Sequence, residues 1–273
     1  HGLSGELPSG LKAKGIKSIV TIHDLIFIRY PHLYSFFDRK IHYLKFKKAT
    51  KNADLIIAIS EQTKHDIIQY LRVDSSKIKV IYQGCNAIFK SNSSEESKKT
   101  VAQKYQLPDR YMLMVGSIEA RKNAVTLLKA FALLPLNKRP RLVILGKATA
   151  YIKLVKKTMM DLGIEQEVTY IHNASFQDLP AIYQGAVLFT YPSLFEGFGI
   201  PLLEAMKMGT PVITSSVTSM PEVAGEAALL VNPDSLEDIA MSLQKIVDNP
   251  ALRIDLKRKG LSRYKDFSWE KSA

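Results

Sequence analysis

The chain has 273 residues, of which 46% are hydrophobic and 23% charged, a composition typical of a globular protein long enough for two domains. Its single cysteine, Cys85, excludes an internal disulfide and favours a reducing, cytoplasmic compartment. The apolar runs are too short to span a bilayer, and the Cys and His spacing of a zinc site is absent.

The first third of the chain alternates short apolar segments with helical patterns. We predict strands at Ser18–Ile22, Asp54–Ile59 and Lys79–Tyr82, and helices at Tyr34–Asn52 and Glu61–Leu71. This order predicts parallel βαβ units. Three strands are too few for an independent domain of this type, so we expect residues 1–92 to be the later part of a longer domain. The polar stretch Lys90–Lys99 is the best linker candidate.

The helix predicted at 34–52 carries a dense basic segment, Asp38–Lys51, next to Phe36 and Phe37. A basic helix with aromatic residues can lie on an anionic membrane surface, here the inner face of the plasma membrane. The alternative is an ordinary solvated helix face that covers the sheet. A net charge of +12 also permits nucleic-acid binding, but the chain has no recognised nucleic-acid motif, so we expect none.

A second α/β block occupies residues 93–255 and predicts a complete doubly wound domain with a parallel sheet. The predicted strands are Tyr111–Val115, Leu142–Leu145, Val168–Ile171, Val187–Thr190, Val212–Thr214 and Ala228–Val231. The predicted helices are Val125–Leu134, Tyr151–Leu162, Leu179–Gln184, Leu202–Lys207, Leu236–Val247 and Pro250–Tyr264. We expect residues 256–273 to form a helical segment that returns toward the first domain.

Ligands of an open parallel sheet bind beyond the carboxyl ends of the strands, so the loops that follow these strands are candidate sites. After the first strand of the second block, Gly116 allows a tight turn, Arg121 and Lys122 supply two cations, and Asn123 can cap the next helix. Two cations beside a helix N-terminus suit a diphosphate. The alternative is a solvent-facing Arg-Lys pair. The spacing of the Walker phosphate loop and the Gly-x-Gly-x-x-Gly fingerprint are both absent.

Two later loops reach the same predicted edge. His172 and Asn173 lie in the stretch Tyr170–Ala174, which could line a base pocket or be an ordinary β-to-α turn. Glu196 and Glu204 are separated by seven residues, with Pro201 suited to the first turn of a helix. Both carboxylates can then face a pocket in front of a helix N-terminus, which suits a ligand with hydroxyls and an anion. A Glu pair at this spacing can also be a capped helix.

Several of these segments resemble glycosyltransferase family 4, whose members are retaining enzymes of the GT-B fold. The resemblance rests on Phe195–Met206, with its Glu-x7-Glu spacing, and on Val115–Asn123, Thr210–Ser216, Pro221–Ala228, Thr21–Leu25 and Ala53–Ser60. It implies two Rossmann-like domains that face a cleft, an acceptor-side domain at residues 1–92 and a nucleotide-sugar-binding domain at residues 93–255. The resemblance covers nearly the whole chain, and the combination of motifs is highly specific.

The resemblance also implies roles for individual residues. Glu196 would contact the donor sugar, Glu204 would hold the ribose hydroxyls, and Arg121 and Lys122 would neutralise the leaving diphosphate. The further residues that it implies are His23 near the donor sugar and, for donor binding, Gly116, Ser117, His172, Asn173, Phe198, Gly199 and Ile200. Many relatives have an arginine where Ser117 stands, so the division of labour between Arg121 and Lys122 is open. By spacing alone, His23 fits a structural strand-end histidine equally well.

The implied function is retaining transfer of a hexose from a GDP- or UDP-linked sugar to a glycan or lipid-linked acceptor in cell-surface polysaccharide synthesis. The Glu-Ala-Arg-Lys-Asn loop and the His23-Asp24 segment most resemble mannosyltransferases, which favours mannose mildly. The alternatives are a GT-B nucleotide-sugar epimerase and a non-catalytic binding protein that keeps the fold. The sequence contains no Asp-x-Asp motif, so we expect a metal-independent reaction and no cofactor besides the nucleotide-sugar substrate.

Overall fold

The structure, a computed structural model, describes residues 1–273 except Ser4, residues 90–92 and Ala273. The chain divides into two compact units, which are described separately. The first unit consists of His1–Gln83, Phe195–Gly199 and Trp269–Ala273, and the second of Gly84–Leu194 and Ile200–Ser268. The domain limits that we predict at residues 92 and 255 stay predictions.

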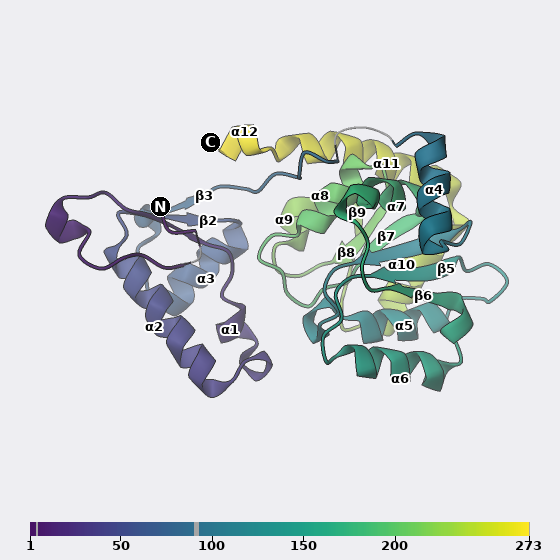
Figure 1. The fold of residues 1–273 in the computed structure, drawn as a ribbon, viewed down its shortest axis with the longest axis horizontal. Coiled ribbons are helices and arrows are strands. Elements are labelled where there is room, and N and C mark those ends of the chain that lie inside the picture. The colour runs from purple at the N-terminus through teal and green to yellow at the C-terminus, as the bar shows by residue number, and fades with distance from the viewer. Residues whose placement is uncertain (4, 90–92, 273) are drawn as a thin grey trace. The chain divides into compact units, whose positions relative to one another are not determined.

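The first unit is built on a three-stranded parallel sheet in the order β1-β2-β3 (Figure 1). Its strands are β1 (Ile19–Ile22), β2 (Leu55–Ala58) and β3 (Ile78–Val80), and its helices are α1 (Ile26–Arg29), α2 (Phe36–Asn52), α3 (Glu61–Leu71) and α12 (Trp269–Ser272). Val20, Ile22, Ile56 and Ala58 are fully buried with Ile67 of α3. The parallel arrangement therefore follows from apolar strands that helices cover.

The second unit contains a six-stranded parallel sheet in the order β6-β5-β4-β7-β8-β9. The strands are β4 (Tyr111–Val115), β5 (Arg141–Leu145), β6 (Val168–Ile171), β7 (Leu188–Tyr191), β8 (Val212–Ser215) and β9 (Ala228–Val231). The chain runs outward from β4 to β6 and then returns to place β7 on the other side of β4. The strand order therefore reverses between β4 and β7, the point at which doubly wound folds bind their ligands.

Helices cover both faces of this sheet (Figure 1). They are α4 (Glu95–Tyr105), α5 (Ala124–Ala132), α6 (Ile152–Leu162), α7 (Leu179–Gly185), α8 (Ile200–Lys207), α9 (Met220–Ala224), α10 (Leu236–Asp248) and α11 (Pro250–Arg263). Every residue of β4, β7 and β8 is buried. Strands that are buried on both faces need continuous apolar runs, which is why these segments were readable in the sequence.

The predicted α/β fold with parallel sheets is confirmed, and the predicted strands occur with ends shifted by a residue or two. The linker predicted at residues 90–99 is wrong in its second half. Residues 90–92 lie outside the described part of the chain, but α4 begins at Glu95, where the Ser94 side chain accepts a hydrogen bond from Ser97 N. Serine before two glutamates is a helix N-terminus signal that outweighs the polar composition.

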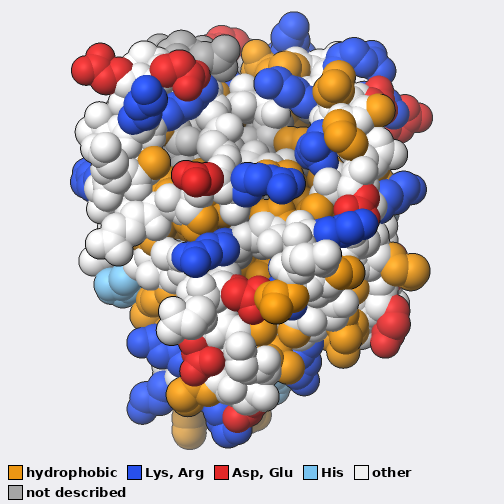
Figure 2. Space-filling model, turned by 90° about the vertical axis from the view of Figure 1, so that its right-hand side faces the viewer, with side chains coloured by type: hydrophobic (Ala, Val, Ile, Leu, Met, Phe, Trp, Pro, Cys, Tyr) orange, Lys and Arg blue, Asp and Glu red, His pale blue; other side chains and the backbone are white. Residues whose placement is uncertain are grey.

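Among the described residues, no helix combines the length and the apolar character needed to cross a membrane. On the face drawn in Figure 2, the basic side chains are interspersed with acidic and apolar ones. The net charge of +12 is therefore not gathered into one continuous patch among the coloured residues of this face.

Candidate active site

A buried lysine marks the strand-order reversal of the second unit. Lys122 lies in a 3-10 turn, Ala120–Lys122, after β4, and it is only 6% exposed. Its ammonium group donates a hydrogen bond to the Tyr191 hydroxyl and lies 4.7 Å from the centre of that ring. Burial of a cation costs free energy unless polar or anionic groups compensate for the lost water. A buried lysine at this edge therefore suits an anionic ligand. Lys122 comes from the β4 end and Tyr191 from the β7 end, as expected for a site at this reversal.

Glycine is required where the loops after β4 and β5 pass each other. Gly116 has a φ of +143°, a left-handed conformation that other residues rarely adopt. A Cβ atom on Gly146 would lie 1.9 Å from the Gly116 carbonyl oxygen. A Cβ on Gly116 would lie 3.6 Å from Lys122 Cε, so the turn backbone runs directly beside the lysine side chain. The structure therefore brings the predicted Gly116 and Lys122 together.

Arg121 and Ser117 are joined through a residue that the sequence reasoning did not single out. Ser117 donates to Glu119 Oε1 at 2.6 Å, and Arg121 Nε donates to Glu119 Oε2 at 2.9 Å. Both side chains of the ion pair are partly exposed. Glu119 thus lies between the predicted phosphate cation and the serine that stands where many relatives have arginine. An incoming diphosphate would compete with Glu119 for Arg121.

Asn123 does not cap α5 with its side chain, and that part of the prediction is wrong. Its φ is +64°, and its side-chain amide instead donates to the carbonyls of Pro192 and Pro233 at 3.1 and 2.7 Å. The buried Asn123 therefore connects the loops after β4, β7 and β9 through hydrogen bonds. Its left-handed backbone, which asparagine tolerates better than most residues, turns the chain from Lys122 into α5.

Glu204 is the fifth of the eight residues of α8, one turn from its start, and Pro201 occupies the first turn of this helix, as predicted. Glu204 is 8% exposed, and the Tyr183 hydroxyl donates to its Oε2 at 2.8 Å. Burial raises the pKa of Glu204 to about 7, although the hydrogen bond from Tyr183 opposes the shift. Burial, and then the charge of Glu204, raise the pKa of Cys85 to about 12, so this thiol does not act as a nucleophile at neutral pH.

The loop after β6 reaches the loop after β5. His172 Nδ1 lies 3.3 Å from the Ala148 N–H, which donates to it, and 3.2 Å from the Tyr170 hydroxyl. Tyr170 in turn donates to the Gly146 carbonyl at 2.8 Å. His172 and Asn173 are both exposed. These contacts place His172 one loop away from Gly116, at the same edge of the sheet.

Glu196 belongs to a segment of the first unit, Phe195–Gly199, that is held by other residues of that unit. The Ser60 hydroxyl donates to the Gly197 carbonyl at 2.7 Å. A Cβ on Gly197 would lie 2.3 Å from the His23 carbonyl oxygen, so only glycine fits there. The Phe198 ring stacks on Tyr82 with centroids 5.9 Å apart. Glu196 itself is buried, with 8% of its surface exposed.

Arg29 supports the other end of this segment. Its guanidinium group makes a bidentate ion pair with the fully buried Asp66 at 2.7–3.0 Å. It also lies 5.9 Å from the centre of the Phe195 ring, and Tyr30 lies 5.7 Å from the same ring. Since Asp66 fixes the guanidinium, the Phe195 ring meets a rigid surface. Phe195, Gly197 and Phe198 therefore each have a fixed partner around Glu196.

His23 is exposed, and its Nε2 lies 2.9 Å from the Leu3 carbonyl. It lines a pocket of about 480 Å³ in the first unit, together with Tyr82 and Trp269. Asp24 accepts a hydrogen bond from Ile26 N at 3.0 Å, so it fixes the loop before α1. His23 thus meets the Glu196 segment through its backbone carbonyl, while its ring faces an open pocket.

The predicted site residues fall into two sets, one in each unit. The second unit holds Gly116, Ser117, Arg121, Lys122, His172, Asn173, Ile200 and Glu204, and the first holds His23, Glu196, Phe198 and Gly199. The sequence analysis did not single out Tyr183, Tyr191 or Glu119. Tyr191 directly follows the predicted strand Val187–Thr190 and is the last residue of β7, a position from which a side chain could have been expected at the edge. Nothing in the spacing of Tyr183 pointed to Glu204.

The fold and the second unit's edge define a Rossmann-like α/β protein with a buried cation and a buried carboxylate around a ligand-binding edge. Residues 94–263 match the family Glycosyl transferases group 1, and residues 1–87 match Glycosyltransferase Family 4. The chain belongs to the group 1 glycosyltransferases, and its fold is that of the GT-B enzymes.

Two curated relatives are mannosyltransferases from Escherichia coli. The chain is 32% identical to O-antigen chain mannosyltransferase B over 275 residues, covering 99% of this chain and 70% of the relative. It is 30% identical to the serotype-specific mannosyltransferase WbdA, covering 94% of this chain and only 32% of the relative. The chain thus spans about a third of the length of WbdA.

The crystal structure of HepE from Anabaena, solved in complex with UDP and glucose, matches the chain with a TM-score of 0.83 at 18% identity. The match covers 96% of this chain and 71% of the solved chain. At this identity the likeness shows the fold.

Proposed function

We propose that this chain transfers a hexose, with mannose favoured, from a nucleoside-diphosphate sugar to a glycan or lipid-linked acceptor in polysaccharide synthesis. The observation that carries the proposal is the buried Lys122, which lies beside Gly116 at the reversal between β4 and β7. A cation that is pre-positioned at this edge suits a leaving diphosphate. The similarity to O-antigen mannosyltransferases supports the choice of mannose.

The reaction breaks the bond between the anomeric carbon and the diphosphate while the acceptor hydroxyl forms the new bond. Lys122 and Arg121 stabilise the negative charge that develops on the leaving group, and Glu196 faces the positive charge that develops on the sugar. Among the residues that the structure describes, we find no clear nucleophile for a double displacement. We therefore favour attack from the side of the leaving group, whose phosphate oxygen takes the acceptor proton, with retention of configuration.

The proposed reaction needs no metal ion, because two cationic side chains of the loop after β4 take the role of neutralising the diphosphate. The direct experiment measures transfer of mannose from GDP-mannose, with UDP- and ADP-sugars in parallel, in excess EDTA. We expect transfer to continue in EDTA and to fall about 10²–10³-fold in Lys122→Ala. Activity that is lost in EDTA and restored by Mg²⁺ contradicts the metal-free mechanism. Release of free nucleotide without an acceptor points instead to an epimerase.

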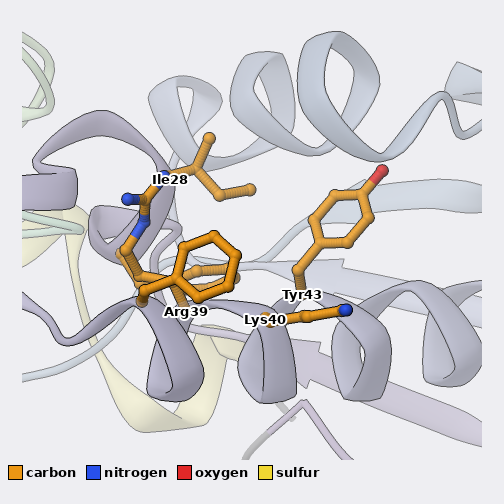
Figure 3. A pocket seen from close by; sticks show the side chains of 6 residues that line it. Ile28, Arg39, Lys40 and Tyr43 are labelled. Carbon is orange, nitrogen blue, oxygen red and sulfur yellow. The ribbon is translucent and has the colours of Figure 1, made fainter.

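The helix α2 supports a proposal about location, at the cytoplasmic face of the plasma membrane. Phe36, Phe37, Ile41 and Leu44 are 67%, 74%, 52% and 56% exposed, an unusual density of exposed apolar surface on one helix. Basic side chains accompany them, and Arg39, Lys40 and Tyr43 of α2 line a pocket of about 240 Å³ with Ile28 of α1 (Figure 3). Apolar side chains beside cations suit an anionic lipid surface.

A liposome test separates this location from a solvated helix. We expect the protein to sediment with anionic vesicles more than with neutral ones at low salt, and Phe37→Ser to weaken the binding severalfold. Met241, which is 65% exposed on α10 of the second unit, gives the matched control, because Met241→Ser removes a similar apolar side chain elsewhere. Equal sedimentation with both kinds of vesicle contradicts the proposal.

A further inference from the structure

Tyr183 is the hydrogen-bond partner that the described part of the chain gives to the Glu204 carboxylate. The tyrosine lies on α7, which packs beside α8, and its side chain is fully buried. Its hydroxyl donates to Glu204 Oε2 at 2.8 Å. A hydrogen bond to a buried carboxylate is among the stronger ones in proteins, because the acceptor is charged and shielded from water.

The tyrosine is itself held on several sides, so its hydroxyl has little freedom. The Thr210 hydroxyl donates to the Tyr183 carbonyl at 2.7 Å. The rings of Phe89 and Phe189 lie 5.8 and 5.3 Å from the Tyr183 ring. Neither the tyrosine nor its helix takes part in the proposed chemistry. These contacts therefore hold the Tyr183 hydroxyl in the position from which it donates to Glu204 and orients that carboxylate.

We propose that Tyr183 is a positioning residue for ribose recognition: it occupies Oε2 of Glu204 and so leaves Oε1 to accept from the ribose of the donor nucleotide. This inference rests on the proposed nucleotide-sugar function. It goes beyond that function because it assigns the ribose contact to Oε1 of Glu204 and explains this choice by the hydrogen bond from Tyr183 to Oε2. A Glu204 side chain that lacks Tyr183 loses both its orientation and a stabilising donor.

The protonation state of Glu204 follows from the same arrangement. A ribose hydroxyl donates better to the carboxylate than to the carboxylic acid, so binding strengthens as Glu204 ionises. The hydrogen bond from Tyr183 lowers the pKa of Glu204 against the effect of burial. The other titratable groups that act on the pair are Cys85 and Tyr191, and Lys207 acts through Cys85. Removal of the Tyr183 hydroxyl should therefore move the ionisation of Glu204 to higher pH.

The experiment measures the affinity of GDP-mannose and UDP-glucose by titration calorimetry between pH 6 and 9. Both phosphates of these ligands are esterified and keep their charge in this range, and the onset of titration of the guanine and uracil bases near pH 9 is the same for every variant. We expect Tyr183→Phe to weaken nucleotide-sugar binding about tenfold at pH 7 and less at pH 9. Inorganic pyrophosphate, which reaches Lys122 and Arg121 but has no ribose, should bind within twofold of the wild type. Glu204→Gln should bind nucleotide sugars with an affinity that is flat in pH.

Tyr111→Phe provides the matched control. Tyr111 is another buried tyrosine of the same unit, 3% exposed, but its hydroxyl donates to the Ile182 carbonyl at 2.6 Å. This variant should leave nucleotide-sugar affinity within twofold. The inference is overturned if Tyr183→Phe binds like the wild type, or if it loses pyrophosphate and nucleotide sugar by the same factor. A wild-type protein that binds neither ligand defeats the proposed function itself.

Discussion

Glu196 and Glu204 are equally buried, each with 8% of its surface exposed, but the molecule holds them by different means. Glu204 is part of helix α8, and a hydrogen bond from Tyr183 holds its carboxylate. Glu196 lies in a loop segment without regular structure, whose backbone and rings are fixed by Ser60, Tyr82 and Arg29 of the first unit.

The contrast teaches that burial alone does not tell how precisely a carboxylate is placed. A helix supplies its own backbone hydrogen bonds, so Glu204 needs only a side-chain partner. The backbone of a loop forms its hydrogen bonds with other segments, so the position of Glu196 depends on residues far away in the sequence. Substitutions of Glu204 or of Tyr183 should therefore have effects different from those of substitutions of Glu196 or of Ser60.

The largest expected effect separates the roles of the two glutamates. We expect Glu196→Gln to lower kcat about 10²–10³-fold with nucleotide affinity within threefold of the wild type, because in the proposed mechanism the lost charge faces the sugar in the transition state. Glu204→Gln should instead weaken nucleotide binding about tenfold and leave kcat within threefold. Steady-state kinetics with calorimetric nucleotide titrations check both. Equal losses of kcat in the two variants would remove the distinction.

The second prediction concerns how burial of the Glu204 carboxylate makes the free energy of unfolding depend on pH. The folded protein holds the Glu204 proton with a pKa of about 7, whereas the unfolded chain releases it near 4.5. The free energy of unfolding should therefore fall as pH rises from 4.5 to 7, by up to about 3 kcal/mol, and stay low above 7. Urea unfolding of the wild type and of Glu204→Gln at pH 5 and pH 8 measures this.

The informative quantity is the difference between the two proteins, because other carboxylates contribute to both. We expect Glu204→Gln to gain stability relative to the wild type between pH 5 and pH 8. Parallel pH dependence in the two proteins would mean that Glu204 is solvated in solution.

The smallest effect tests the support of Glu196. Ser60→Ala removes the hydrogen bond to the Gly197 carbonyl, and we expect kcat to fall about tenfold with nucleotide affinity unchanged. Ser60→Thr keeps a hydroxyl and should recover most of the loss. Ser60 also caps α3, so the loss of a cap needs its own control.

Ser35 provides that control, because its side chain caps α2 of the same unit, where its partner is Asp38 and not a residue of the Glu196 segment. Ser35→Ala should cost about 1 kcal/mol of stability, as any lost cap does, and leave kcat within twofold. Similar kinetics in Ser35→Ala and Ser60→Ala would show that general stability, and not the loop, limits the reaction.

Most elements of the fold could be read from the sequence. A strand such as Tyr111–Val115 is a continuous apolar run, because both faces of the sheet are covered. The alternation of these runs with helical patterns predicted the parallel order. The helix α4 was missed because its sequence is polar, and its stability depends on packing beside α7 and on the Ser94 cap.

The candidate site was only partly readable. Gly116, Lys122 and Glu204 were predicted because glycine, charge and position after a strand are local signals. The ion pair of Arg121 with Glu119 and the true partners of Asn123 were not. Each of these side chains could bond to several polar groups, and only the distances in the folded chain decide which of them becomes the partner.

The sequence by itself determined which segments are strands and helices, and which loops carry cations and carboxylates, because these depend on short-range pattern and charge. Only the tertiary structure decided that Tyr191 meets Lys122, that Tyr183 takes one oxygen of Glu204, and that Ser60 holds the Glu196 loop. These partners are 69, 21 and 137 residues apart in the chain, so local pattern and charge do not indicate which residues meet, and only the packing within each folded unit brings them within hydrogen-bond distance.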